Sequence, residues 1–264
     1  MNGTIALAAA TTALLLVGAG CSTSTGPSGS VSGSPSAAAE SQTLTVFAAA
    51  SLKTTFTALG QQFESSHAGT KVTFSFAGSS DLVTQLQQGA PGDVFASADI
   101  TNMDKATGDS LVKGDPVNFA SNTLEIAVPP DNPAMISSFA DLAEDGVKVV
   151  VCAPQVPCGS ATQKVETATG VTLEPVSEEN SVTDVLNKVT SGETDAGLVY
   201  KTDVKSAGDK VLGVPFPESG EAVNVYPIAV LTGSKHADLA QEFVDLVAGT
   251  EGRQVLADAG FGKP

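Results

Sequence analysis

The sequence predicts an α/β protein whose mostly parallel sheets are arranged in two lobes. From residue 43 onward, short apolar strands alternate with helical patterns, which is typical of parallel sheets covered by helices. Two extended apolar segments, 122–128 and 224–231, lie far apart in the chain, as expected where a chain leaves one lobe and later returns. The 264 residues are enough to bury a core without a disulfide scaffold, and they show no internal repeat.

The first part of this body begins with a strand and a helix. Residues 44–50, LTVFAAA, are a strand candidate, and Phe56, Leu59 and Phe63 recur behind them on one face of a helix. The alternation continues through strands at 71–76 and 93–97, a helix containing Leu82 and Leu86, and a helix at 99–106.

The second part continues the pattern and predicts the division into lobes. We expect lobe one to contain residues 43–121 and 228–264, and lobe two residues 122–227. The strands are expected at 123–128, 147–152, 196–200 and 223–231, and the helices at 160–169, 182–189, 238–248 and 251–259.

Charge and composition exclude several classes of protein. The chain has 13 Lys and Arg against 29 Asp and Glu, a net charge of −16, and no Trp. Without a basic patch, a nucleic-acid platform is excluded. The two histidines, His67 and His236, are isolated in the sequence, so few ligands are available for a metal site.

The N-terminus predicts export and a lipid anchor. Residues 1–20 are uncharged, and their apolar stretch is too short for a comfortable membrane span, so they fit a signal peptide. The sequence VGAGC, ending in Cys21, resembles a bacterial lipoprotein signal, in which the cysteine is lipidated. An ordinary signal peptide followed by a free Cys21 is the alternative. Residues 21–42 are rich in Ser, Gly and Pro and predict a flexible tether.

Cys152 and Cys158 predict a disulfide that closes a small loop. They are separated by five residues, and cysteines of an exported protein are commonly oxidised. The alternative, a metal-binding pair, lacks a second pair of ligands.

Four junctions between strands and helices carry a hydroxyl residue among small neighbours: AAASL at Ser51, FAGSSDL at Ser79, PCGSA at Ser160 and NSVT at Ser181. In an open α/β sheet such junctions lie at the carboxyl ends of the strands, where ligands bind. Helix N-termini there offer free N–H donors and positive dipole ends to an anion. Each serine could instead be an ordinary helix cap.

The type of donor restricts the anion. Hydroxyl and backbone N–H donors without acceptors suit a fully deprotonated oxyanion, whereas hydrogen phosphate carries a proton that needs an acceptor. A site of this kind needs no Lys or Arg, so the net charge of −16 is compatible with an anionic ligand.

These motifs resemble those of a known family. The segments TVFAAASL at 45–52, FAGSS at 76–80, GAPGDVFASAD at 89–99 and GLVY at 197–200 look like the periplasmic molybdate-binding proteins of ABC importers. The similarity runs in order from about residue 43 to Gly260 and Phe261 near the end. It implies a type II periplasmic-binding-protein fold that closes on molybdate, and also on tungstate, between its lobes.

The resemblance also implies the binding residues. Ser51 and Ser79 would each give a hydroxyl and an N–H, Cys158 and Val182 a backbone N–H, and Tyr200 its hydroxyl. The family commonly has Ala at the position of Cys158 and Arg at the position of Thr183.

The resemblance implies a role in transport without catalysis. It predicts an extracytoplasmic monomer that uses no cofactor and is held to the membrane through Cys21. It would deliver its ligand to a molybdate permease and its ATPase subunit, because no phosphate-binding loop GxxxxGK[ST] occurs in the chain.

Two alternatives remain open from the residues. The same fold could bind sulfate or another tetrahedral oxyanion, because a sequence does not measure a cavity. A secreted serine hydrolase would use Ser51, Ser79 or Ser160, although the G-x-S-x-G pattern and a nearby base are missing. Asp93 and Asp99 are interpreted as a strand start and a helix cap, and Tyr226 as packing between the lobes.

Overall fold

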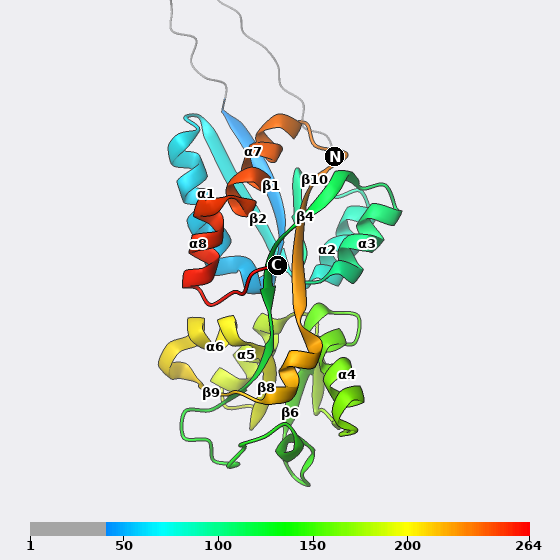
Figure 1. The fold of residues 1–264 in the computed structure, drawn as a ribbon, viewed down its shortest axis with the longest axis vertical. Helices are drawn as coiled ribbons and strands as arrows, with labels where there is room; N and C mark the ends of the chain where they lie inside the picture. The colour runs from blue at the N-terminus through cyan, green and yellow to red at the C-terminus, as the bar shows by residue number, and fades with distance from the viewer. Residues whose placement is uncertain (1–40) are drawn as a thin grey trace, which may run out of the picture. The chain divides into compact units, whose positions relative to one another are not determined.

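A computed structural model describes residues 41–264, which form two five-stranded sheets with helices packed on them (Figure 1). The predicted signal peptide at residues 1–20, Cys21 and the tether as far as residue 40 lie outside the described residues. Among the helices of residues 41–264, none combines the length and the hydrophobicity that a membrane crossing requires.

The first sheet lies in the upper part of Figure 1. Its strands, in spatial order, are β2 (Thr70–Ala77), β1 (Gln42–Ala49), β3 (Val94–Ala96), β10 (Asn224–Leu231) and β4 (Val112–Asn122). Its helices are α1 (Lys53–Ser66), α2 (Ser79–Gln87), α3 (Ile100–Gly108), α7 (Ala237–Ala248) and α8 (Thr250–Asp258), with a 3-10 turn, η1 (Ala50–Leu52), before α1.

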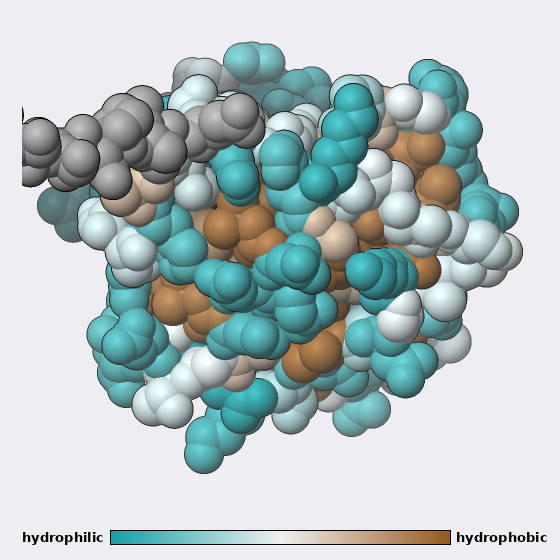
Figure 2. Space-filling model, turned by 90° about the horizontal axis from the view of Figure 1, so that it is seen from above, coloured by the Kyte–Doolittle hydropathy of each residue, from teal (hydrophilic) through white to brown (hydrophobic). Residues whose placement is uncertain are grey.

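The apolar run of β1 is continuous because both faces of the strand are covered. Successive side chains of a strand point to opposite faces. Val46 and Ala48 therefore join the core under α1, α7 and α8, whereas Phe47 joins a second core under α2 and α3. Figure 2 looks onto the end of the molecule at the top of Figure 1, where hydrophilic residues cover much of the face and hydrophobic ones form separate small areas.

The second sheet has a single large core and contains the remaining elements. Its strands, in spatial order, are β7 (Ser177–Glu179), β6 (Val149–Cys152), β8 (Ala196–Tyr200), β5 (Leu124–Val128) and β9 (Leu212–Val214). Its helices are α4 (Pro157–Thr169), α5 (Val182–Thr190) and α6 (Lys201–Ala207), with 3-10 turns η2 (Ala140–Ala143), η3 (Gly208–Lys210) and η4 (Pro217–Ala222).

The chain passes between the sheets at two adjacent strands. β4 ends at Asn122 and β5 begins at Leu124, while β10 enters the first sheet at Asn224, directly opposite Asn122. Figure 1 shows β4 and β10 side by side in the first sheet, running toward the second.

The predicted two-lobed α/β fold with mostly parallel sheets is confirmed, and in each sheet a single strand runs against the other four. β10 runs antiparallel to β3 and β4, and β5 runs antiparallel to β8 and β9. β4 was missed between residues 112 and 121 because half of that stretch is exposed and it carries Gly114 and Pro116, which interrupt a strand pattern.

Candidate functional site

The parallel strands of both sheets place their carboxyl ends around one cavity. The five residues suggested by the resemblance all line it: Ser51 follows β1, Ser79 follows β2, Cys158 follows β6, Val182 follows β7, and Tyr200 ends β8. The other lining residues are Ala49, Ala50, Gly78, Ala98, Val156 and Pro157. None of these lining residues is charged.

The cavity is small and closely walled. Ser79, Cys158, Val182 and Tyr200 are each at most 3% exposed, while Ser51 is partly exposed. The cavity volume is about 10 Å³, which is roughly the space that one ordered water needs. A sugar or a peptide does not fit such a volume.

Three helices begin at the cavity wall. Ser79 is the first residue of α2, Val182 is the first residue of α5, and Cys158 is the second residue of α4. N–H groups in the first turn of a helix have no acceptor within that helix, and the helix dipole is positive there. The wall is therefore rich in hydrogen-bond donors and attracts negative charge.

One of these helices begins earlier than the sequence predicts. α4 starts at Pro157 rather than at residue 160, because proline is well suited to the first helical position. Ser160 consequently lies inside the helix, whereas the N–H of Cys158 falls in the first turn.

The hydrogen bonds of the serines at the strand–helix junctions show which of them cap a helix and which face the cavity. Ser181 is an ordinary cap, since its Oγ accepts from Asp184 N at 3.3 Å. Ser51 and Ser79 cap no helix: Ser79 Oγ accepts from Ala98 N at 3.0 Å, and Ser51 Oγ lies 3.1 Å from Tyr226 Oη. One of the two lone pairs of Ser79 Oγ is thus occupied, and the hydroxyl proton is available to the cavity.

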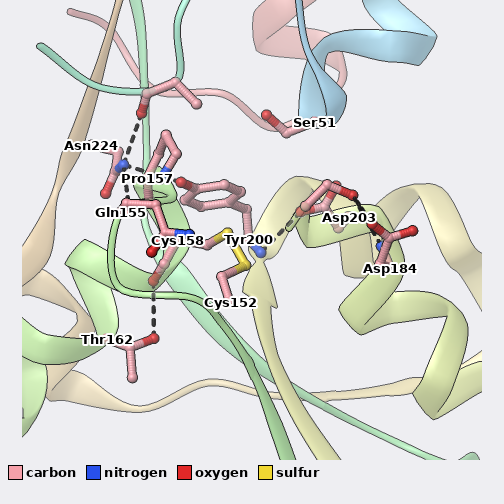
Figure 3. The surroundings of a disulfide bond; sticks show 12 residues. Ser51, Cys152, Gln155, Pro157, Cys158, Thr162, Asp184, Tyr200, Asp203 and Asn224 are labelled. Atoms are coloured by element: carbon pink, nitrogen blue, oxygen red, sulfur yellow. Dashed lines mark hydrogen bonds between the residues drawn. A yellow bond between two sulfur atoms is a disulfide. The ribbon is translucent and has the colours of Figure 1, made fainter. Parts of the chain in front are cut away.

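Tyr200 stays protonated in this environment. Burial, followed by the nearby Tyr226, raises the pKa of Tyr200 well above its ordinary value. Tyr200 Oη also receives a hydrogen bond from Asn224 Nδ2 at 3.0 Å (Figure 3). A neutral phenol whose oxygen already accepts one hydrogen bond retains a proton to donate.

The structure contains the disulfide that the cysteine spacing predicts. Cys152 ends β6, Cys158 lies in the first turn of α4, and their Cα atoms are 5.6 Å apart. The enclosed loop also bonds to the backbone, with Ala153 N donating to Glu179 O at 2.9 Å. The disulfide therefore fixes the segment that carries the Cys158 N–H (Figure 3).

Glycine is required where two loops of the cavity wall meet. A Cβ on Gly78 would lie 2.0 Å from Asn180 O, between the start of α2 and the loop before α5. Neither segment could keep its position with a larger residue there.

Within residues 41–264, the groups of a serine hydrolase are not assembled around Ser51. His67 lies at the far end of α1, where its Nε2 is 2.7 Å from Glu242 Oε2 and its ring stacks on Phe63. Asp93 and Asp99 are structural, as interpreted: Asp93 Oδ2 accepts from Thr45 N at 2.8 Å, and Asp99 caps α3 by accepting from Asn102 N at 2.9 Å.

Sequence reasoning missed two residues behind the cavity. Tyr226 is fully buried and contacts Ser51 through its hydroxyl, although we interpreted it as packing alone. Asn224 contacts Tyr200 and received no interpretation. An amide at the start of an otherwise apolar strand, NVYPIAVL, was the signal that could have marked it.

Comparison with known proteins gives consistent matches. The family described as "Bacterial extracellular solute-binding protein" matches residues 44–262. The molybdate-binding protein ModA of Mycobacterium tuberculosis is 54% identical over 223 residues, which cover 84% of this chain and 85% of the relative. ModA of Escherichia coli is 31% identical and covers 83% of this chain and 88% of its own length.

A solved structure supports the fold. The periplasmic molybdate-binding protein of Azotobacter vinelandii superimposes with a TM-score of 0.74 at 24% identity, covering 84% of this chain and 99% of that chain.

Proposed function

We propose, on the premise that the chain belongs to the family of bacterial extracellular solute-binding proteins, that its cavity captures molybdate, and also tungstate, for an ABC importer. The observation that carries this proposal is a cavity between the two sheets whose lining offers hydroxyl and N–H donors and no charged side chain. The 54% identity to a molybdate-binding protein over most of both chains supports the choice of ligand.

Five residues would bind the anion. Ser51 and Ser79 would donate through their hydroxyl and N–H groups, Cys158 and Val182 through their N–H groups, and Tyr200 through its hydroxyl. All of them line the same cavity, and they come from both sheets. A ligand that contacts both sides favours the closed arrangement, because those contacts form together only when the sides meet.

The lobes would follow the division expected from the sequence, 43–121 with 228–264 and 122–227. The two sheets and the paired crossing strands β4 and β10 support this division. The ligand would be released to a molybdate permease driven by its ATPase subunit, and the protein would act as a monomer without catalysing a reaction. We also propose anchoring to the membrane through a lipid on Cys21.

Titration calorimetry of the purified protein with molybdate, tungstate, sulfate and phosphate tests the function. Molybdate and tungstate should bind, while sulfate and phosphate give no heat of binding. Binding of sulfate together with molybdate would keep the oxyanion site and reject the specificity. No binding of any of the four anions would refute the proposal.

Two neighbouring serines provide a matched pair of variants. Ser79→Ala removes a hydroxyl that faces the ligand, and a hydrogen bond to a charged group contributes about 1.5–3 kcal/mol, so affinity should fall roughly 10- to 150-fold. Ser80 is the next residue of α2, and within the described residues its buried Oγ has no hydrogen-bond partner. Ser80→Ala should leave the affinity unchanged, and an equal loss in both variants would argue against a direct role for Ser79.

A further inference from the structure

Asn224 is a buried amide that contacts both sides of the cavity from behind. It is 5% exposed and lies at the start of β10, outside the set of residues that line the cavity. Its Nδ2 lies 2.8 Å from Ala98 O in the first lobe, and 3.0 Å from Tyr200 Oη and 3.3 Å from Pro157 O in the second. Figure 3 shows Asn224 beside Tyr200 and Pro157.

The neighbours of Asn224 determine which atom of its amide points toward Tyr200. Ala98 O and Pro157 O are carbonyl oxygens, which only accept hydrogen bonds. The amide atom that faces them must therefore be the nitrogen, which only donates. The same nitrogen contacts Tyr200 Oη, so the phenol oxygen is the acceptor in that hydrogen bond.

This direction has a consequence for the cavity. Tyr200 Oη cannot donate to Asn224 Nδ2, and burial raises the pKa of Tyr200 so that the phenol keeps its proton. An anion in the cavity that Tyr200 lines can then accept this proton in a hydrogen bond in place of Tyr226 Oη, the other hydroxyl beside Tyr200. The lone pair that could have accepted a proton from a ligand is engaged by the amide.

We propose that Asn224 is a positioning residue that makes Tyr200 a donor, and that it thereby selects fully deprotonated oxyanions over protonated ones. This inference rests on the proposed function, because it assumes an oxyanion bound in the cavity. Asn224 itself does not touch the ligand and acts through the Tyr200 hydroxyl.

A double-mutant cycle separates this role from a general structural one. The four proteins are the unaltered chain, Asn224→Ala, Tyr200→Phe and the double variant, each titrated with molybdate by calorimetry. In the unaltered background, Asn224→Ala should weaken binding roughly 10-fold or more, as loss of a well-oriented donor to a charged ligand requires. In the Tyr200→Phe background it should change affinity less than about 3-fold, because the hydroxyl through which it acts is absent.

An isosteric variant tests the direction of the hydrogen bond. Asn224→Asp, titrated at pH 8.5 so that the buried carboxyl is ionised, replaces the amide nitrogen with an oxygen that accepts the Tyr200 proton, so Tyr200 then turns a lone pair toward the cavity. The ratio of phosphate affinity to molybdate affinity should rise at least about 10-fold relative to the unaltered protein, since hydrogen phosphate brings its own proton. This variant also serves if Asn224→Ala does not fold, which a thermal melt would show.

A control variant shows whether the effect is specific to Asn224, and two results would contradict the inference. Asn132→Ala removes an asparagine whose amide bonds to Ile136 O at 2.8 Å and lies outside the cavity, so molybdate affinity should stay unchanged. Equal losses from Asn224→Ala in both backgrounds, or an unchanged anion ratio in Asn224→Asp, would overturn the inference while leaving the function intact. Failure of the unaltered protein to bind any oxyanion would refute the proposed function itself.

Discussion

Asp203 is a buried carboxyl beside the site and should make the stability of the protein depend on pH. It is 8% exposed, near the start of α6, and its Oδ2 accepts from Tyr200 N at 3.0 Å. Burial raises the pKa of Asp203 from 3.8 to about 7, and the single backbone hydrogen bond offsets only part of this effect. The folded protein therefore holds this proton more tightly than the unfolded chain does.

The sign and size of the effect follow from that difference. Below pH 3.8 Asp203 is protonated in both the folded and the unfolded state, so it does not lower the free energy of unfolding. As the pH rises toward 7, the unfolded chain loses the proton and the folded protein retains it, so the free energy of unfolding falls. Because one pKa unit corresponds to about 1.4 kcal/mol, the full cost above pH 7 is about 4 kcal/mol.

Asp203→Asn removes this cost and keeps an oxygen that can accept from Tyr200 N. Urea denaturation at pH 5 and at pH 8 should show that the variant gains stability relative to the unaltered protein as the pH rises. Most of the gain should appear between these two values. A stability difference that is the same at both pH values would refute the reasoning, because a lost contact without a titrating group has no reason to depend on this pH range.

Three further predictions concern the same region. Asp203→Asn should also raise molybdate affinity above pH 7, since it removes a negative charge near Tyr200. Calorimetry at pH 6 and pH 8.5 checks this, and an equal gain in affinity at both pH values would contradict it. Replacing Cys152 and Cys158 with Ala should weaken molybdate binding and lower the free energy of unfolding by about 2 kcal/mol, the value expected for a disulfide that closes a loop of this length. An unchanged free energy of unfolding in urea denaturation would exclude a stabilising role for the disulfide. Gly78→Ala should reduce affinity because the new Cβ would meet Asn180 O at 2.0 Å, whereas Gly108→Ala, with open space around it, should bind like the unaltered protein.

The local signals in the sequence were sufficient for the elements that matter most to the site. The apolar run at β1 and the alternation at β2 follow from burial of strand faces, and the small residues after them predict close approach to a ligand. The edge strand β9 (Leu212–Val214) was missed, because three residues with an exposed leucine carry no periodic pattern.

The capping pattern of the serines could not be resolved from the sequence. Ser79 and Ser181 look alike as small hydroxyl residues at helix starts, yet Ser181 caps α5 and Ser79 accepts from Ala98 N. The difference depends on β3, which ends two residues before Ala98 and places Ala98 N beside Ser79, 19 residues earlier in the chain. A hydroxyl has the same local preferences in both places, so only its neighbours in space separate the two roles.

By itself, the sequence determined the two-lobed α/β class, the disulfide spacing and the set of donors at the strand ends, because these depend on periodicity and on residue type along the chain. Only the tertiary structure decided which way the hydrogen bonds run. Asn224 is 24 residues from Tyr200 and 126 from Ala98, and the carbonyl groups that orient its amide lie in different lobes. Donor and acceptor roles depend on every neighbour of a buried polar group, and those neighbours come together only when the two sheets are packed.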